Sequence, residues 1–286
     1  MYKNPFNYIG AKYKLLPQIL PLFPSNIETF VDLFGGSGEV TFNTNAKHYV
    51  YNEKSIPLVN IFKNLDSKFI VEVEEVIKKY QLSKENKQGF LLLRKYYNDN
   101  LDKMSSRENA IILYCLLSHA FNYQIAFNSK GEYNMPSGAG RSYFSKPMKE
   151  KLEQYIKIKE QRDIMFLSKD FIDVDIQSIG KAENTFVYVD PPYLITVGAY
   201  ERDYFCKWSE QYEKMLLDYL DNLDANGYKF ALSNVLEHKG KSNDILKAWS
   251  QKYIVHYLNK DYKNCNYQTK DKTANSSIEV LITNYK

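Results

Sequence analysis

The sequence predicts an α/β fold with a doubly wound, mixed sheet that a mostly helical segment interrupts. Strand and helix patterns alternate over residues 1–65 and return after residue 163, whereas residues 66–162 show helical patterns and one long polar loop. We therefore expect one catalytic domain formed by residues 1–65 and 163–286, with residues 66–162 inserted into it. A chain of 286 residues is long enough for this arrangement.

The composition is that of a globular protein, with 44% hydrophobic and 25% charged residues. No apolar run approaches the ~18 residues that a membrane-spanning helix needs. The three cysteines are far apart in the chain, which favours a reducing compartment, and they form no Cys/His pattern with zinc spacing. We therefore expect a cytoplasmic protein without a membrane anchor or a metal site.

The first part of the chain begins with a helix pattern over residues 12–20, which Pro21 ends. Short apolar strands are expected at 30–34 and 48–51. Ser55 is a candidate N-cap for the helix that follows the second strand. This order of helix, strand, strand and helix fits the first half of a doubly wound sheet.

The middle of the chain has apolar residues at helical spacing over 70–80, 89–97 and 108–121. A polar, glycine-rich loop is expected over residues 122–147. Loops of this length inside a compact domain are usually functional or disordered, and the aromatic residues in this one favour function.

The last part of the chain returns to alternation. Strands are expected at 164–167, 185–189, 228–232, 253–258 and 278–283, and helices at 210–223 and 244–249.

The first strand leads into a glycine-rich turn that contains Asp32, Phe34, Gly36 and Gly38. Such a turn lets the backbone approach a nucleotide-like ligand closely, although many α/β proteins also turn on glycine for structural reasons. Its spacing differs from G-x-G-x-x-G, which disfavours a nicotinamide or flavin enzyme. Glu53, after the next strand, is either within reach of a ribose diol or a solvated loop residue.

The strand expected at 185–189 is followed directly by the sequence Asp190-Pro191-Pro192-Tyr193. The prolines fix the backbone and donate no hydrogen bond, so the carbonyl groups there are rigid acceptors. A carboxylate beside such a carbonyl can accept both hydrogens of an exocyclic amino group, and the tyrosine offers a face on which a base can stack. This pattern indicates chemistry on the amino group of a nucleobase.

The D-x-F-x-G-x-G turn followed by D-P-P-Y resembles the S-adenosylmethionine-dependent DNA adenine-N6 methyltransferases. An N-terminal P-F-x-x-x-G-x-K element (residues 5–12) and the helical insertion between the two motifs are similar to the Dam-type (alpha, or D12) class. The resemblance covers nearly the whole chain. It implies a Rossmann-like, class I methyltransferase fold with a helical target-recognition insertion at 66–162.

The resemblance also implies roles for single residues. Asp190, Pro191, Pro192 and Tyr193 would hold the flipped adenine for catalysis. Residues implied to contact S-adenosylmethionine are Tyr8, Gly10, Lys12, Asp32, Phe34, Gly36, Gly38, Glu53, Asp170, Phe171 and Asp190.

Double-stranded DNA is the implied partner, and a cognate restriction endonuclease is another partner that such enzymes can have. The residues expected to contact DNA are Asn7, Asn122, Asn128, Lys130, Asn134 and Arg141. Arg141 is the candidate for reading a base, with a phosphate contact or plain exposure as its alternatives. GATC-specific members have arginine where this chain has Ala126, so the resemblance does not predict GATC specificity.

The charge is uneven along the chain. Residues 239–272 contain eight lysines against three aspartates, an excess larger than the net charge of +4 of the whole chain. This stretch is either a solvated surface or a contact for the DNA phosphates.

Two other functions stay open from the sequence. Cytosine-N4 methyltransferases use the same chemistry but usually carry Ser before Pro-Pro-Tyr, so Asp190 favours adenine. A DNA-binding regulator that kept the fold without activity is disfavoured by the intact Asp190, Tyr193 and glycine turn.

Overall fold

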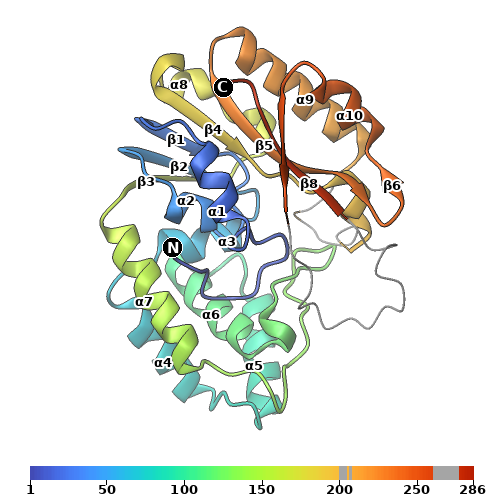
Figure 1. The fold of residues 1–286 in the computed structure, drawn as a ribbon. Coiled ribbons are helices and arrows are strands. Elements are labelled where there is room, and N and C mark those ends of the chain that lie inside the picture. The colour runs from blue at the N-terminus through green and yellow to red at the C-terminus, as the bar shows by residue number, and fades with distance from the viewer. Residues whose placement is uncertain (200–204, 206–207, 260–276) are drawn as a thin grey trace.

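The computed structural model describes residues 1–199, 205, 208–259 and 277–286. Within these residues the centre of the molecule is an eight-stranded sheet (Figure 1). Seven strands follow the order β3-β2-β1-β4-β5-β8-β7, and β6 pairs with β5. The strands are β1 (Thr29–Asp32), β2 (His48–Asn52), β3 (Asp163–Leu167), β4 (Thr185–Val189), β5 (Lys229–His238), β6 (Lys241–Ser242), β7 (Ile254–Leu258) and β8 (Ser277–Thr283).

Strand β1 is the topological switch point of the sheet. It pairs in parallel with β2 on one side and with β4 on the other, and β3 and β5 continue the parallel arrangement outwards. Strand β8 is antiparallel to both β5 and β7. The predicted α/β class with a mostly parallel central sheet is confirmed. In such sheets ligands bind beyond the carboxyl ends of the strands at the switch point, which here means the ends of β1 and β4.

Alternate residues of the central strands face opposite sides of the sheet, and helices cover both sides. Phe30 and Phe186 pack with α1 and α2, whereas Val31 and Val187 pack with α9 and α10. Burial on both faces is the usual environment of parallel strands. The helices beside the sheet are α1 (Leu16–Ile19), α2 (Glu39–Asn43), α3 (Ile56–Lys63), α8 (Ile176–Ile179), α9 (Glu210–Ala225) and α10 (Asp244–Ser250).

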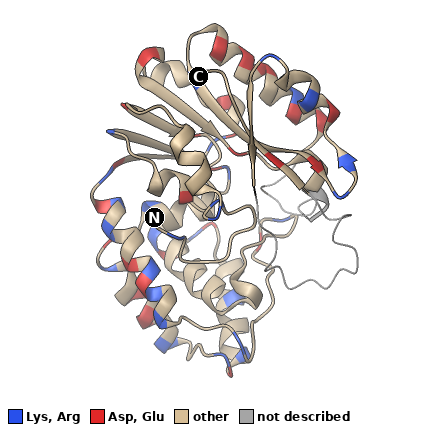
Figure 2. Cartoon of the chain, in the orientation of Figure 1, with Lys and Arg blue, Asp and Glu red and all other residues tan. Residues whose placement is uncertain are grey.

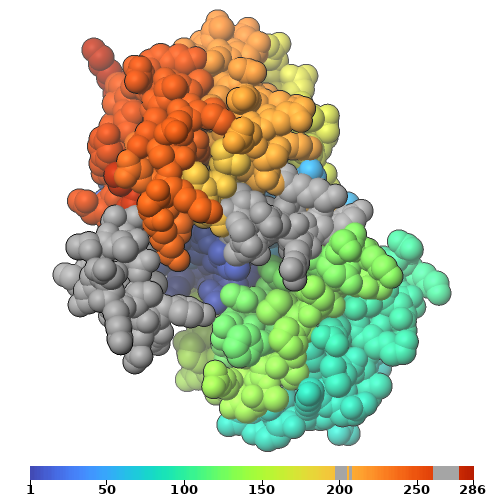
Figure 3. Space-filling model, turned by 90° about the vertical axis from the view of Figure 1, so that its right-hand side faces the viewer, coloured from blue at the N-terminus to red at the C-terminus, as the bar shows by residue number. Residues whose placement is uncertain are grey.

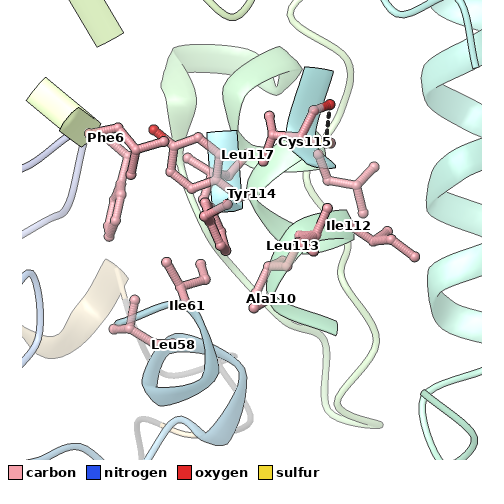
Figure 4. Close-up of a cluster of buried hydrophobic side chains, with 14 of the residues drawn as sticks. Phe6, Leu58, Ile61, Ala110, Ile112, Leu113, Tyr114, Cys115 and Leu117 are labelled. Carbon is pink, nitrogen blue, oxygen red and sulfur yellow. Dashed lines mark hydrogen bonds between the residues drawn. The ribbon is translucent and has the colours of Figure 1, made fainter. Parts of the chain in front are cut away.

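Between α3 and β3 the chain forms four longer helices: α4 (Phe69–Lys79), α5 (Lys87–Asp99), α6 (Ser106–His119) and α7 (Lys146–Glu160). Helix α6 is central, because every residue from Asn109 to His119 is buried. Phe6 of the N-terminal segment and Leu58 and Ile61 of α3 belong to the same hydrophobic cluster as α6 (Figure 4). The helical segment therefore shares its core with the N-terminal part of the chain, and its treatment as a separate insertion stays a prediction.

The sequence predicted α4, α5 and α6 but not α7. Helix α7 buries Met148, Leu152, Tyr155 and Ile156, which recur at helical spacing between five lysines and three glutamates. Ser55 is the N-cap residue of α3, as predicted, although its side chain makes no capping hydrogen bond. Short 3-10 turns complete the chain: η1 (Leu20–Leu22), η2 (Phe121–Tyr123), η3 (Phe171–Asp173), η4 (Ala182–Asn184) and η5 (Leu194–Ala199).

The loop predicted at 122–147 is ordered by short contacts rather than by strands. Isolated bridges join Ala120 to Ser137 and Phe127 to Tyr133. Asn98 of α5 hydrogen-bonds both the N–H and the carbonyl of Tyr133, at 2.9 and 3.1 Å, as a neighbouring strand would. The loop is therefore held in place by α5.

Charged residues of both signs lie along α7, α9 and α10 (Figure 2). In the described part of the chain, no helix is long and apolar enough to cross a membrane.

Gly38, which precedes α2, provides a stability test. It has φ +72°, and an added Cβ would lie 2.8 Å from the Phe42 ring, whereas at Gly240 (φ +78°) an added Cβ would meet no atom within 4 Å. We expect Gly38→Ala to lower the free energy of unfolding by about 2–4 kcal/mol, because it combines backbone strain with overpacking. Gly240→Ala should cost only about 1 kcal/mol, for the strain alone. Equal losses for the two variants in urea unfolding would contradict this account.

Candidate functional site

A cavity of about 460 Å³ lies at the carboxyl ends of β1, β2 and β4. In the space-filling view a hollow separates the C-terminal elements in orange and yellow from the green residues of the helical segment, with blue N-terminal residues at its floor (Figure 3). All the predicted catalytic residues and all but one of the predicted cofactor residues line the cavity. These are Tyr8, Gly10, Lys12, Asp32, Phe34, Gly36, Glu53, Asp170, Phe171, Asp190, Pro191, Pro192 and Tyr193; Gly38 is the exception.

Asp190 follows β4 and is held by two other residues of the cavity. Lys12 Nζ lies 2.6 Å from Asp190 Oδ2, and the Tyr193 hydroxyl donates to Asp190 Oδ1 at 2.9 Å. Only 17% of the Asp190 side chain and 6% of the Lys12 side chain are exposed. Burial raises the pKa of Asp190, and the Lys12 ammonium limits that rise.

Lys12 is itself fixed from several directions. Its ammonium donates to the Gly10 carbonyl at 2.7 Å and lies 5.2 Å from the centre of the Tyr193 ring. The N–H of the next residue, Tyr13, donates to the buried Glu39 at 2.7 Å, and the Asn4 side chain donates to the other oxygen of Glu39 at 2.7 Å. Glu39, the first residue of α2, therefore holds the N-terminal loop, which contains Lys12, against this helix. The sequence analysis did not identify Glu39.

The glycine turn at the end of β1 is closed by Glu53. One Glu53 oxygen accepts the N–H of Gly36 at 3.1 Å, and the other accepts the N–H of Ser55 at 2.9 Å. Gly36 has φ +48°, and an added Cβ would lie 3.0 Å from the Tyr8 ring, so this position requires glycine. The backbone of the turn thus approaches Tyr8 across the cavity wall.

Asp32 at the end of β1 is a buried carboxylate with one free oxygen. Its Oδ2 accepts from the Thr41 hydroxyl at 2.6 Å, whereas Oδ1 has no hydrogen-bond partner. Burial raises the pKa of Asp32 to about 7, and the nearby Asp190 and Glu53 contribute to the rise. An unsatisfied buried carboxylate oxygen in a cavity wall suits a ligand that carries a cationic or hydrogen-bond-donating group.

Asn52 ties three strand ends together behind the cavity. Its side chain donates to the carbonyls of Leu33 and Lys169 and accepts the N–H of Lys169. Beside it, Lys54 pairs with Asp170 at 2.7 Å. The sequence analysis did not identify Asn52, whose role depends on β3 lying next to β2.

An aromatic wall closes one side of the cavity. The Phe34 and Phe171 rings are 5.5 Å apart, and both lie within 6 Å of the Trp208 ring. Tyr212 completes the group, 5.9 Å from Trp208. Phe34 and Phe171 are predicted cofactor contacts. The sequence analysis did not single out Trp208 and Tyr212, because they follow the Asp190–Tyr193 turn by more than ten residues and belong to no motif.

The residues predicted to contact DNA lie largely outside the cavity. Asn7 lines it, and its side chain donates to the Asn122 carbonyl at 3.0 Å, which joins the N-terminal loop to the loop at 122–147. The Asn128 side chain is bonded within this loop, to Glu132 at 2.7 Å. Lys130, Asn134 and Arg141 are exposed and do not line the cavity that contains the Asp190–Tyr193 turn.

The lysine-rich stretch is described only up to residue 259, so four of its eight lysines lie outside the described residues. Of the other four, Lys247 pairs with Glu237, and Lys252 pairs with Asp221. Lys239 and Lys241 are exposed near the β5–β6 turn. Two of the described lysines are thus already neutralised by acidic residues.

In the part of the chain that the structure describes, no three His, Cys, Asp or Glu side chains come together as metal ligands would.

A mostly parallel sheet with a glycine turn after β1 and an acid-Pro-Pro-Tyr turn after β4, both facing one cavity, fits the class I methyltransferase fold. Comparison with known families places the chain more narrowly. It belongs to the D12 class N6 adenine-specific DNA methyltransferases, whose family model matches residues 8–264.

Single relatives agree with this family. The chain is 42% identical to modification methylase StsI of Streptococcus sanguinis and 41% identical to type II methyltransferase M.FokI of Planomicrobium okeanokoites. Each match covers 99% of this chain but only 43% of the relative. Type II methyltransferase M1.LlaDCHI of Lactococcus lactis subsp. cremoris is 26% identical over 99% of this chain and 95% of its own length.

The raised pKa of Asp32 predicts how stability depends on pH. A carboxyl group with a pKa of about 7 when folded and 3.8 when unfolded binds protons preferentially in the folded state between these values, so stability falls as pH rises through that window. Asp32→Asn removes this loss and should raise the free energy of unfolding at pH 8 by up to about 4 kcal/mol, with little change at pH 4. Urea unfolding without ligand at both pH values measures this, with the exposed Asp218→Asn as control. A similar pH dependence in Asp32→Asn and the wild type would refute it.

Proposed function

We propose that this chain transfers a methyl group from S-adenosylmethionine to the exocyclic N6 of adenine in duplex DNA. The observation that carries the proposal is the position of Asp190. Its carboxylate faces the same cavity as the glycine turn, and Lys12 and Tyr193 fix both of its oxygens. A methyl donor and an amino acceptor can therefore be held side by side, which is the main requirement of a direct transfer.

The residues at the end of β1 fit the donor. Asp32 has an unpartnered buried oxygen that suits the α-ammonium group of S-adenosylmethionine. Glu53 would hold the ribose hydroxyls, and Asp170 and Phe171 would contact the adenine. S-Adenosylmethionine, when bound, supplies a methyl group that is already activated by the positive sulfonium. No nucleophilic side chain is then required.

Asp190 acts on the acceptor. The adenine amino nitrogen is a weak nucleophile, because its lone pair is delocalised into the ring. Asp190 and the Pro191 carbonyl would accept its two hydrogens and favour the pyramidal, reactive nitrogen. Burial raises the pKa of Asp190, and the Lys12 ammonium at 2.6 Å opposes that rise and so favours the ionised form, which accepts hydrogen bonds.

The target base has to leave the DNA stack to reach Asp190, at a cost of a few kcal/mol. Stacking on the Tyr193 ring would offset about 1–3 kcal/mol of this cost. The cavity of about 460 Å³ lies within the range of small-molecule sites.

The helical segment at 66–162 would carry target recognition. Its loop at 122–147 lies on the side of the hollow opposite the C-terminal elements (Figure 3) and reaches Asn7 at the cavity. Asn122, Asn128, Lys130, Asn134 and Arg141 of this loop would contact the DNA. The names of StsI and M.FokI as modification or type II enzymes support a role beside a cognate restriction endonuclease.

Removal of the Asp190 carboxylate tests the reaction. Asp190→Ala should lower N6-adenine methylation at least about a hundredfold, because one preorganised polar group at the reacting centre contributes that much. Purified protein, tritiated S-adenosylmethionine and DNA from a methylation-free host provide the assay, with mass spectrometry of the nucleosides. Asp163→Ala, an exposed carboxylate at the start of β3, is the control. Unchanged methylation by Asp190→Ala, or N4-methylcytosine as the product, would overturn the proposal.

Tyr193 variants separate the ring from its hydroxyl. Tyr193→Phe keeps the stacking face and loses the bond to Asp190, so a loss of turnover of less than about tenfold is expected. Tyr193→Ala loses both, and turnover should fall about tenfold to a hundredfold. Donor affinity, measured by calorimetry, should change little in either variant. An equal loss of turnover in both variants would assign the effect to the hydroxyl and contradict the stacking role.

A further inference from the structure

A buried glutamate on α9 has no role in the mechanism above. Glu213 is completely inaccessible to solvent, and its pKa is raised by burial. Its Oε2 accepts the indole N–H of Trp208 at 2.7 Å, and its Oε1 accepts from the side chains of Asn243 at 3.0 Å and Asn234 at 3.4 Å. No lysine or arginine of the described chain forms a salt bridge with it. Burying an ionisable group without a charged partner costs folding free energy. The role of Glu213 therefore depends on the side chains that it holds in place.

Trp208, whose indole N–H donates to Glu213 Oε2, forms part of the cavity wall. Trp208 lines the cavity and packs edge-on against Phe34, with ring centres 5.8 Å apart and planes at 78°. Its ring centre is also 5.9 Å from that of Phe171. Phe34 and Phe171 follow β1 and β3 respectively, so Trp208 joins residues from two strand ends into one aromatic surface.

We propose that Trp208 forms part of the surface that binds the adenine ring of the methyl donor, and that Glu213 is a positioning residue that fixes the plane of the indole. This inference rests on the proposed function. A flat purine needs flat apolar neighbours at a defined angle. The Glu213 hydrogen bond takes up the only polar atom of the indole, so the ring offers the ligand an apolar surface and no competing donor.

The chain contains a matched pair for this contact. Trp249, the other of its two tryptophans, donates its indole N–H to Asp221 Oδ1 at 2.9 Å. Trp249 packs against Phe230 and Tyr253 on the face of the sheet covered by α9 and α10, and it does not line the cavity. The Trp249–Asp221 pair is therefore an indole–carboxylate contact away from the cavity, in which the carboxylate, like that of Glu213, also has other partners: the Tyr253 hydroxyl and Lys252.

The first experiment uses fluorescence in the Trp249→Phe variant, where Trp208 is the only tryptophan. Titration with S-adenosylmethionine, and separately with S-adenosylhomocysteine, should change the Trp208 emission, with the same Kd that calorimetry gives. In the converse variant, Trp208→Phe, the remaining Trp249 emission should not respond. No change of Trp208 emission under conditions where calorimetry records binding would overturn the proposal.

The second experiment measures affinity. Trp208→Ala should raise the Kd for S-adenosylmethionine about tenfold, the usual effect of one lost base–aromatic contact, while the KM for DNA stays within about twofold. Glu213→Gln should raise the Kd for the donor about threefold or more. A glutamine has one acceptor oxygen and cannot accept from the indole on one side and from two amides on the other.

Asp221→Asn is the control for a merely structural effect. Like Glu213→Gln it weakens a carboxylate that accepts an indole N–H, so both variants should be less stable in urea, but only Glu213→Gln should change donor affinity and Trp208 emission. Donor affinity that is unchanged in both Trp208→Ala and Glu213→Gln overturns this inference and leaves the methyltransferase proposal standing. Failure of the wild type to bind the donor at all would instead overturn the proposed function.

Discussion

The ion pair between Lys12 and Asp190 is the constraint on which the rest of the site depends. Burial at the end of β4 disfavours the charged carboxylate and raises its pKa, and the ammonium at 2.6 Å offsets part of that penalty. Removing one member of a buried pair leaves an uncompensated charge, so the two ends of the pair have to be placed together reliably. Asp190 is placed by its strand. Lys12 belongs to an irregular N-terminal loop. The hydrogen bonds from Asn4 and Tyr13 to Glu39 fix the position of this loop, as the sheet fixes the position of Asp190.

The same logic extends to the other strand ends. Parallel strands finish at one edge of the sheet and leave backbone groups there that lack partners. Asn52 satisfies groups from two neighbouring strand ends, and Glu53 satisfies two N–H groups, one of them in the glycine turn. Asp32 Oδ1 is left unsatisfied in this otherwise well-bonded edge. This oxygen therefore suits a ligand that carries a hydrogen-bond donor or a cationic group.

Sequence reasoning was most successful where a residue's environment is set by its near neighbours. The strands β1, β2 and β4 are short apolar runs, and the Asp190–Tyr193 turn combines unusual residues. The sequence therefore predicted the strands and the turn correctly. The sequence did not predict the roles of Asn52, Glu39 and Trp208. Each of them contacts a residue more than twenty positions away, and the aromatic wall that contains Trp208 forms only in the folded chain. Gly38 is a different case: its motif position predicts a ligand contact, which stays a prediction, while the structure shows that an added Cβ there would lie 2.8 Å from the Phe42 ring.

The helical segment and the N-terminal loop share one hydrophobic core. The N-terminal loop that presents Lys12 also contains Phe6, which packs in the cluster formed by α3 and α6, and the Tyr114 hydroxyl of α6 approaches the Pro5 carbonyl at 3.5 Å. Helix α6 leads directly into the loop at 122–147, whose Asn122 carbonyl accepts from Asn7. The helical segment is thus joined to the N-terminal loop whose Lys12 pairs with Asp190. One continuous set of contacts therefore runs from the loop at 122–147 through Asn7 and the N-terminal loop to the Lys12–Asp190 pair.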